Sequence, residues 1–124
     1  MTILIVDDEV DIRQLLTTFL SHKGYPAISF ANGQAALKHL RQHQPLPQLI
    51  LLDLMMPVMN GIDFRRAQQQ DPQLAAIPVV VMSAAGEMQT PVLLGDAYLL
   101  KPIDFAALLT LVELYCGQSR QHGQ

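Results

Sequence analysis

The stretch Gln48-Leu49-Ile50-Leu51-Leu52-Asp53-Leu54-Met55-Met56-Pro57 decides the fold. Four apolar residues run directly into an aspartate, and prolines at positions 45, 47 and 57 bound the run. A short continuous apolar run between such breakers predicts a strand buried on both faces, in the middle of a parallel sheet covered by helices. Asp53 then stands at the carboxyl end of this strand, where the ligand and active sites of open α/β sheets lie.

The rest of the chain alternates strand patterns with helical patterns. Besides the strand that ends at Asp53, strands are expected at residues 3–6, 25–30, 77–82 and 97–100. Helices are expected at 10–22, from 33, at 61 to about 70, and from 105. Five strands that alternate with helices predict right-handed βαβ units and an α/β fold with a doubly wound parallel sheet.

Length and composition bound the classes of function. The 124 residues make one domain, expected at 1–117 with a flexible polar tail at 118–124. The net charge is −3 and there is no basic run, so direct nucleic-acid binding is not expected. The apolar runs are too short for membrane insertion, and the N-terminus enters a strand without a signal peptide. The single cysteine, Cys116, suits a packing role in a reducing, cytoplasmic location.

Acidic residues follow two of the expected strands. Asp7 and Asp8 leave the first strand, and Asp53 leaves the third. If the strand order is 2-1-3-4-5, these strands are neighbours and the three carboxylates converge. Converging carboxylates repel one another and raise one another's pKa values, which a hard cation such as Mg²⁺ relieves with oxygen ligands. The alternative, that the first acids only serve the dipole of the following helix, leaves Asp53 unexplained.

Ser83 and Lys101 end the fourth and fifth expected strands. Taken singly, Ser83 is an ordinary turn residue and Lys101 an ordinary surface lysine. At a strand end, however, Lys101 can extend its ammonium over the acidic crevice as a point charge suited to a phosphate or carboxylate. Together the two residues place a hydroxyl donor and a cation opposite the acids.

These motifs resemble the receiver domain of bacterial two-component response regulators. The resemblance rests on Asp7-Asp8-Glu9, on Asp53-Leu54-Met55-Met56-Pro57 followed by Gly61, on Ser83-Ala84, and on Tyr98-x-x-Lys101-Pro102. It covers essentially the whole chain, and its motifs are specific because they agree at four separate strand ends. It implies a flavodoxin-like fold with five parallel strands in the order 2-1-3-4-5.

The resemblance implies a phosphoacceptor rather than an enzyme acting on a separate substrate. Asp53 would take a phosphoryl group from a sensor histidine kinase or a phosphotransfer protein, and would assist its own phosphorylation and dephosphorylation. Asp7, Asp8, Asp53 and the backbone carbonyl of Met55 would hold Mg²⁺. The physics agrees, because a carboxylate is a weak nucleophile and needs charge neutralisation to attack an anionic phosphoryl group.

Three further residues receive roles from the same resemblance. Lys101 would pair with a phosphoryl oxygen, and Ser83 would donate its hydroxyl to the phosphorylated form. Tyr98 would turn inward as Ser83 moves, and the Lys101–Pro102 peptide bond would be cis. The new contacts would favour one of two conformations, and that conformation would control a downstream protein partner.

The chain departs from the family pattern before the fifth strand. The interval from Ser83 to Lys101 is about one helical turn shorter than the family's, and Gly95-Asp96-Ala97-Tyr98 lacks one residue of the usual spacing. Residues 87–95, which include Pro91, therefore predict a shortened fourth helix. We expect a monomer or weak dimer, with activation read by a partner at the first helix or near Met55-Met56.

Three other functions compete with this interpretation. A phosphatase of the haloacid-dehalogenase type needs a second aspartate two residues after the nucleophile, where this chain has Met55. A flavin-phosphate binder on the same fold needs a Gly/Ser/Thr-rich loop where Asp7-Asp8-Glu9 would repel the phosphate. The third alternative, a non-phosphorylated receiver-like protein-interaction module, stays open.

Overall fold

The computed structural model describes residues 2–42, 45–56, 58–84 and 95–117. Within these ranges five parallel strands form one sheet in the order β2-β1-β3-β4-β5. The strands are β1 (Ile3–Val6), β2 (Ala27–Phe30), β3 (Leu49–Asp53), β4 (Val79–Ser83) and β5 (Ala97–Leu100). The described helices are α1 (Val10–His22), α2 (Gly33–Gln42), α3 (Gly61–Gln70) and α4 (Phe105–Val112), which continues into a π-helical turn, η1 (Glu113–Gly117). The predicted α/β class and strand order are confirmed.

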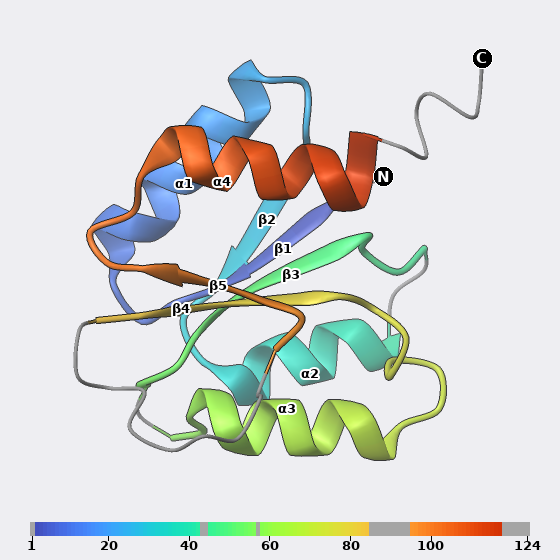
Figure 1. The fold of residues 1–124 in the computed structure, drawn as a ribbon. Helices are drawn as coiled ribbons and strands as arrows, with labels where there is room; N and C mark the ends of the chain where they lie inside the picture. The colour runs from blue at the N-terminus through green and yellow to red at the C-terminus, as the bar shows by residue number, and fades with distance from the viewer. Residues whose placement is uncertain (1, 43–44, 57, 85–94, 118–124) are drawn as a thin grey trace.

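The helices cover both faces of the sheet. Figure 1 shows α1 and α4 on one face and α2 and α3 on the other. Apolar side chains divide accordingly into two clusters, one beneath α2 and α3 and the other beneath α1 and α4. Every residue of β1, β3 and β4 is buried, as predicted for β3, whereas the edge strands β2 and β5 are partly exposed. Cys116 is buried in the cluster of α1 and α4, in the packing role expected of it.

Two strands begin later than the sequence pattern predicted. β2 begins at Ala27 instead of residue 25, because the Tyr25 N–H donates back to the Leu20 carbonyl (2.9 Å) and Pro26 has no N–H. β4 begins at Val79 instead of residue 77, because the Ile77 N–H is used in the preceding turn and a proline follows it. β4 also continues one residue further than expected, to Ser83.

Side-chain caps fix the helices that follow the functional edge. Asn60 accepts a hydrogen bond from the Asp63 N–H (2.9 Å) at the start of α3. Asp104 accepts one from the Ala106 N–H (2.9 Å) at the start of α4, as the sequence indicated. The Lys101–Pro102 peptide bond is cis, as expected. Residues 87–94 of the expected short fourth helix (87–95) and the expected flexible tail at 118–124 lie outside the described residues.

Candidate functional site

Three carboxylates meet at the carboxyl ends of β1 and β3. The two strands are parallel neighbours with Val6 opposite Leu52, so that Asp7 and Asp53 follow as the next residues of each strand. Asp7 and Asp53 are buried, and Asp8 is exposed. One carboxylate oxygen from each of Asp7, Asp8 and Asp53 lies within 4.8 Å of the others. The convergence predicted from the sequence is therefore present in the structure.

Lys101 reaches the same carboxylates from the end of β5. Its Nζ lies 3.2 Å from Oδ2 of Asp7 and 3.2 Å from Oδ1 of Asp53, and its side chain is only 16% exposed. A third acid, Glu9, places Oε1 3.4 Å from the same Nζ. The backbone N–H of Lys101 donates to the Ser83 carbonyl (2.7 Å), which attaches this lysine to the end of β4. Lys101 thus extends over the acidic crevice, as its position at a strand end indicated.

Burial dominates the electrostatics of the pocket. It raises the pKa of Asp53 to about 7, and the neighbouring Asp7 charge adds to the effect while Lys101 opposes it. Burial also raises the pKa of Asp7. Burial alone would lower the pKa of Lys101, but the carboxylates of Asp7 and Asp53 outweigh it and raise this pKa. The lysine stays charged, whereas burial favours the protonated form of each of the two acids.

The donor set fits a hard cation. Asp7 is held in place by the Glu9 N–H, which donates to its Oδ1 (2.9 Å), and by Arg13, which donates to its backbone carbonyl (2.8 Å). Its other oxygen, Oδ2, is buried and accepts no hydrogen bond from the described residues, although the Lys101 ammonium is nearby. A buried carboxylate oxygen without a hydrogen-bond donor, close to two further carboxylates, is a ligand set that Mg²⁺ favours.

Ser83 and Met55 flank this pocket. Ser83 is buried at the end of β4, the strand beside β3, where Asp53 stands opposite Met82. Met55 lies two residues after Asp53 in the loop that follows β3, with an exposed side chain. The roles of the Ser83 hydroxyl and of the Met55 carbonyl stay predictions.

Tyr98 is the second residue of β5, and its side chain lies on the α2 and α3 side of the sheet. Its ring is partly buried and packs against the cluster beneath these helices. Its hydroxyl accepts a hydrogen bond from the Gly95 N–H (2.9 Å), just before β5 begins. The inward turn expected of Tyr98 stays a prediction, and any such turn would have to exchange this bond.

Comparison with known protein families shows which family has this fold and this acidic pocket. The family model described as the response regulator receiver domain matches residues 3–113. The chain belongs to the response regulator receiver family. Receiver domains are the signal-receiving modules of two-component systems, and the acidic pocket with its lysine is the part of this receiver that the sequence had singled out.

Individual relatives agree with this assignment. The chain is 36% identical over 105 residues to the DNA-binding response regulator MtrA of Mycobacterium tuberculosis, covering 81% of this chain and 43% of that protein. It is 36% identical over 105 residues to the phosphate regulon regulator PhoB of Pseudomonas aeruginosa, covering 82% and 45%. The chain thus spans less than half the length of these curated relatives. A CheY-like receiver structure from Methanospirillum hungatei matches with a TM-score of 0.82 and 29% identity, covering 97% of each chain.

Sequence reasoning missed two side chains that belong to this receiver's pocket. Glu9 is one of the three acids beside Lys101, and Arg13 supports the backbone of Asp7. The available signal was their spacing, because residues 9 and 13 are one helical turn apart at the start of α1 and follow the acidic pair. Spacing alone does not determine the direction of a long side chain at the start of a helix, however, because the neighbouring loop also sets it.

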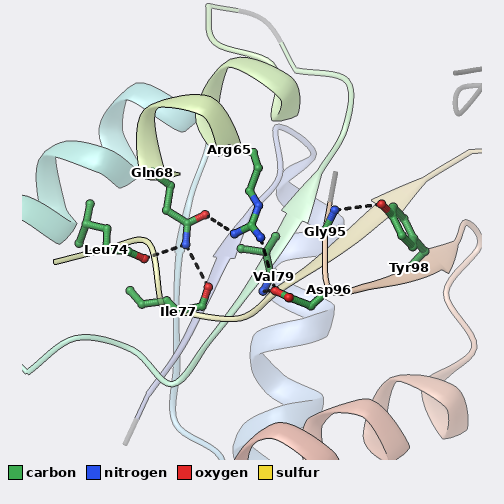
Figure 2. A network of polar contacts seen from close by, with 8 residues as sticks. All are labelled: Arg65, Gln68, Leu74, Ile77, Val79, Gly95, Asp96 and Tyr98. Carbon is green, nitrogen blue, oxygen red and sulfur yellow. Dashed lines mark hydrogen bonds and ion pairs between the residues drawn. The ribbon is translucent and has the colours of Figure 1, made fainter. Parts of the chain in front are cut away.

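A second polar network, also missed, lies on α3 and is drawn in Figure 2. Gln68 is fully buried, and its Nε2 donates to the carbonyls of Leu74 and Ile77 (2.9 and 3.0 Å) in the turn before β4. Its Oε1 accepts a hydrogen bond from Nη1 of Arg65 (2.8 Å). Gln68 therefore occupies a helix position that the apolar periodicity would assign to the core, and its side-chain amide satisfies two backbone carbonyls of the following turn.

The same network continues to the start of β5. Nη2 of Arg65 lies 3.6 Å from Oδ2 of Asp96, and this oxygen accepts a hydrogen bond from the Val79 N–H (2.8 Å). Figure 2 shows the chain of contacts running from α3 to Asp96, next to the Gly95–Tyr98 bond. These contacts lie where β4 and β5 begin, at the edge of the sheet opposite Asp53, so their role is to hold α3 to the sheet.

Proposed function

We propose that this receiver accepts a phosphoryl group on Asp53 in a reaction that needs Mg²⁺, and that the phosphorylated form controls a downstream protein. The observation that carries the proposal is the position of Lys101, whose Nζ is 3.2 Å from Asp53 and 3.2 Å from Asp7. A lysine buried against two acids is otherwise a costly arrangement. It becomes useful when an anionic phosphoryl group arrives between them.

The phosphoryl donor would be a phosphohistidine of a sensor kinase or phosphotransfer protein, or a small acyl phosphate. An oxygen of Asp53 forms the new bond to phosphorus, the bond from phosphorus to the donor's nitrogen or oxygen breaks, and the leaving atom keeps the electron pair. Asp7, Asp8 and the Met55 carbonyl, with Asp53, would hold the metal. A bound Mg²⁺ supplies charge neutralisation on the phosphoryl oxygens. Lys101 supplies the remaining cation at its own strand end.

Phosphorylation would change which contacts are favourable around the pocket. It adds about −1.5 to −2 charges and new acceptor oxygens at residue 53. Lys101, after β5, and the Ser83 hydroxyl, at the end of β4, would be the donors to these oxygens, and Tyr98 would be the residue that changes its position. Reversing a two-state equilibrium from 1:99 to 99:1 takes about 5.5 kcal/mol, which a few charge-assisted hydrogen bonds can supply.

The proposal includes a partner and a location. The receiver is a phosphoacceptor that assists its own chemistry, with a kinase or phosphotransfer protein upstream and a protein partner downstream, in the cytoplasm. The net charge of −3 gives this segment no excess of positive charge that would favour nucleic acid. MtrA is nonetheless a DNA-binding regulator by name, and this chain spans only 43% of it, so DNA binding is a property to test in a full-length protein. The helices in the described ranges are too short or too polar to cross a bilayer.

The test is intact-mass measurement after incubation with acetyl phosphate. The wild-type chain should gain one phosphoryl group with Mg²⁺, and no gain should appear with a chelator or in Asp53→Asn. A gain that persists in Asp53→Asn would refute the assignment of the acceptor. If the wild-type chain gains nothing with Mg²⁺, the alternative of a non-phosphorylated interaction module is favoured.

A further inference from the structure

Glu9 is an exposed third partner of the site lysine. Its Oε1 lies 3.4 Å from Nζ of Lys101 and accepts a hydrogen bond from it. The Glu9 side chain is 59% exposed, whereas the other two partners, Asp7 and Asp53, are buried. An ammonium has three N–H donors, and three carboxylate oxygens lie within 3.4 Å of this one. Lys101 is therefore surrounded by three carboxylates before any phosphoryl group arrives, and it donates a hydrogen bond to Glu9.

The position of the Glu9 side chain is not explained by capping of α1. Glu9 is the N-cap residue of α1, with extended backbone angles (φ −90°, ψ 116°), but its side chain makes no capping hydrogen bond. A short side chain at this position would accept a bond from the first turn, whereas the longer glutamate reaches across to the end of β5. The support that residue 9 gives to Asp7 comes from its backbone N–H, which a side-chain substitution leaves in place.

We propose that Glu9 is a positioning residue that competes with the phosphoryl group for Lys101. This inference rests on the proposed function, because it concerns the phosphorylated state of Asp53. For Lys101 to bind a phosphoryl oxygen, it must give up one of its three carboxylate partners. The solvent-exposed contact with Glu9 is the weakest of the three, so Glu9 sets how readily the lysine is released.

Removing the charge of Glu9 should increase the affinity of the pocket for a phosphoryl group. Glu9→Gln keeps the length of the side chain and removes its charge, so Lys101 should be released more easily. Exposed ion pairs of this kind correspond to a change in affinity of about two- to fivefold. Glu9→Asp retains the charge but shortens the reach, and it should also release Lys101. A general effect of charge near the pocket would instead leave Glu9→Asp like wild type.

The experiment measures the affinity of the Mg²⁺-saturated protein for beryllofluoride, a phosphoryl mimic, by isothermal titration calorimetry. Both Glu9→Gln and Glu9→Asp should bind it about two- to fivefold more tightly than wild type. The matched control is Asp11→Asn, which removes one negative charge from the first turn of the same helix and should leave the affinity unchanged. In a Lys101→Ala background, the Glu9→Gln substitution should no longer have an effect.

Three results would overturn the inference. One is an unchanged or weaker affinity in Glu9→Gln, and another is an equal gain in Asp11→Asn. The third is a gain from Glu9→Gln that persists without Lys101, because that gain would come from direct repulsion of the anion. If Lys101→Ala does not fold, the comparison of Glu9→Gln, Glu9→Asp and Asp11→Asn still decides. Failure of the proposed function would look different, since the wild-type protein would then bind no beryllofluoride and gain no phosphoryl group.

Discussion

Nζ of Lys101 lies 3.2 Å from Oδ1 of Asp53, although 48 positions of the chain separate the two residues (101 − 53). The strands that carry them are not neighbours in the sheet, because β4 lies between β3 and β5. The lysine side chain therefore reaches across the end of β4 to the buried acid. This contact connects the carboxyl ends of β3 and β5 across β4, at the acidic pocket.

The metal-free protein should lose stability as pH rises from 5.5 to 8. The pKa of Asp53 rises on folding from its ordinary 3.8 to about 7, so the folded state retains a proton that the unfolded state has lost. The free energy of unfolding therefore falls as pH rises from 3.8 to about 7 and stays constant above that value. The raised pKa of Asp7 acts in the same direction. The pKa of Lys101 rises from 10.5, so its contribution is constant below that value and does not alter the sign. Urea unfolding with a chelator measures the effect.

The control for this pH dependence is Asp53→Asn, which removes the titrating group and keeps its shape. Its stability should exceed that of wild type at pH 8 and should change less between the two pH values. An identical pH dependence in wild type and Asp53→Asn would show that Asp53 does not carry the raised pKa.

Mg²⁺ should stabilise the wild-type receiver at pH 8 and should stabilise Asp8→Asn much less. Asp8 is exposed, so its substitution spares the core while removing one of the three clustered carboxylates. A ligand at 100 times its Kd adds about 2.7 kcal/mol to the free energy of unfolding. Thermal unfolding across a Mg²⁺ series gives the comparison, with Asp11→Asn as a charge-matched variant that should respond as wild type does. Equal stabilisation of wild type and Asp8→Asn would argue against this metal site.

Val58→Gly should stabilise the protein. Val58 follows the pocket in the loop between β3 and α3, and it has φ 69° although its side chain is β-branched and 76% exposed. Glycine adopts that conformation without strain, and the relief should outweigh its larger unfolded-state entropy by about 1 kcal/mol. Val58→Ala is the matched control, because it removes most of the side chain and keeps the strained φ. If both variants gain equally in urea unfolding, the gain comes from removing an exposed apolar group.

Gln68→Ala should destabilise the fold by about 2–4 kcal/mol, because it removes the buried amide whose Nε2 donates to two turn carbonyls and whose Oε1 accepts from Arg65. Gln69→Ala, an exposed neighbour of the same type on α3, should have little effect. Phosphorylation of the folded fraction by acetyl phosphate should be unchanged in both variants, because the network lies at the far edge of the sheet. A selective loss of phosphorylation in Gln68→Ala would instead tie this network to the site.

The sequence was sufficient for the features that depend on local pattern. Apolar runs identified the buried strands, and acids and a lysine at strand ends identified the pocket, because parallel strands bring their carboxyl ends to one edge. Contacts that depend on side-chain reach were not predictable in the same way. Glu9 and Lys101 are 92 positions apart (101 − 9), and Arg65 meets Asp96 only because α3 packs beside the start of β5. The positive φ of Val58 likewise contradicts the preference of its residue type.

In the proposed function, Asp53 itself carries the phosphoryl group. Borohydride reduces an aspartyl phosphate to homoserine, which marks the acceptor permanently and can be located by peptide mass mapping. After treatment with acetyl phosphate and Mg²⁺, we expect homoserine at position 53 and at no other aspartate, with none formed when a chelator replaces Mg²⁺. Homoserine at Asp7 or Asp8, or a phosphorylated protein with aspartate intact at position 53, would contradict this assignment.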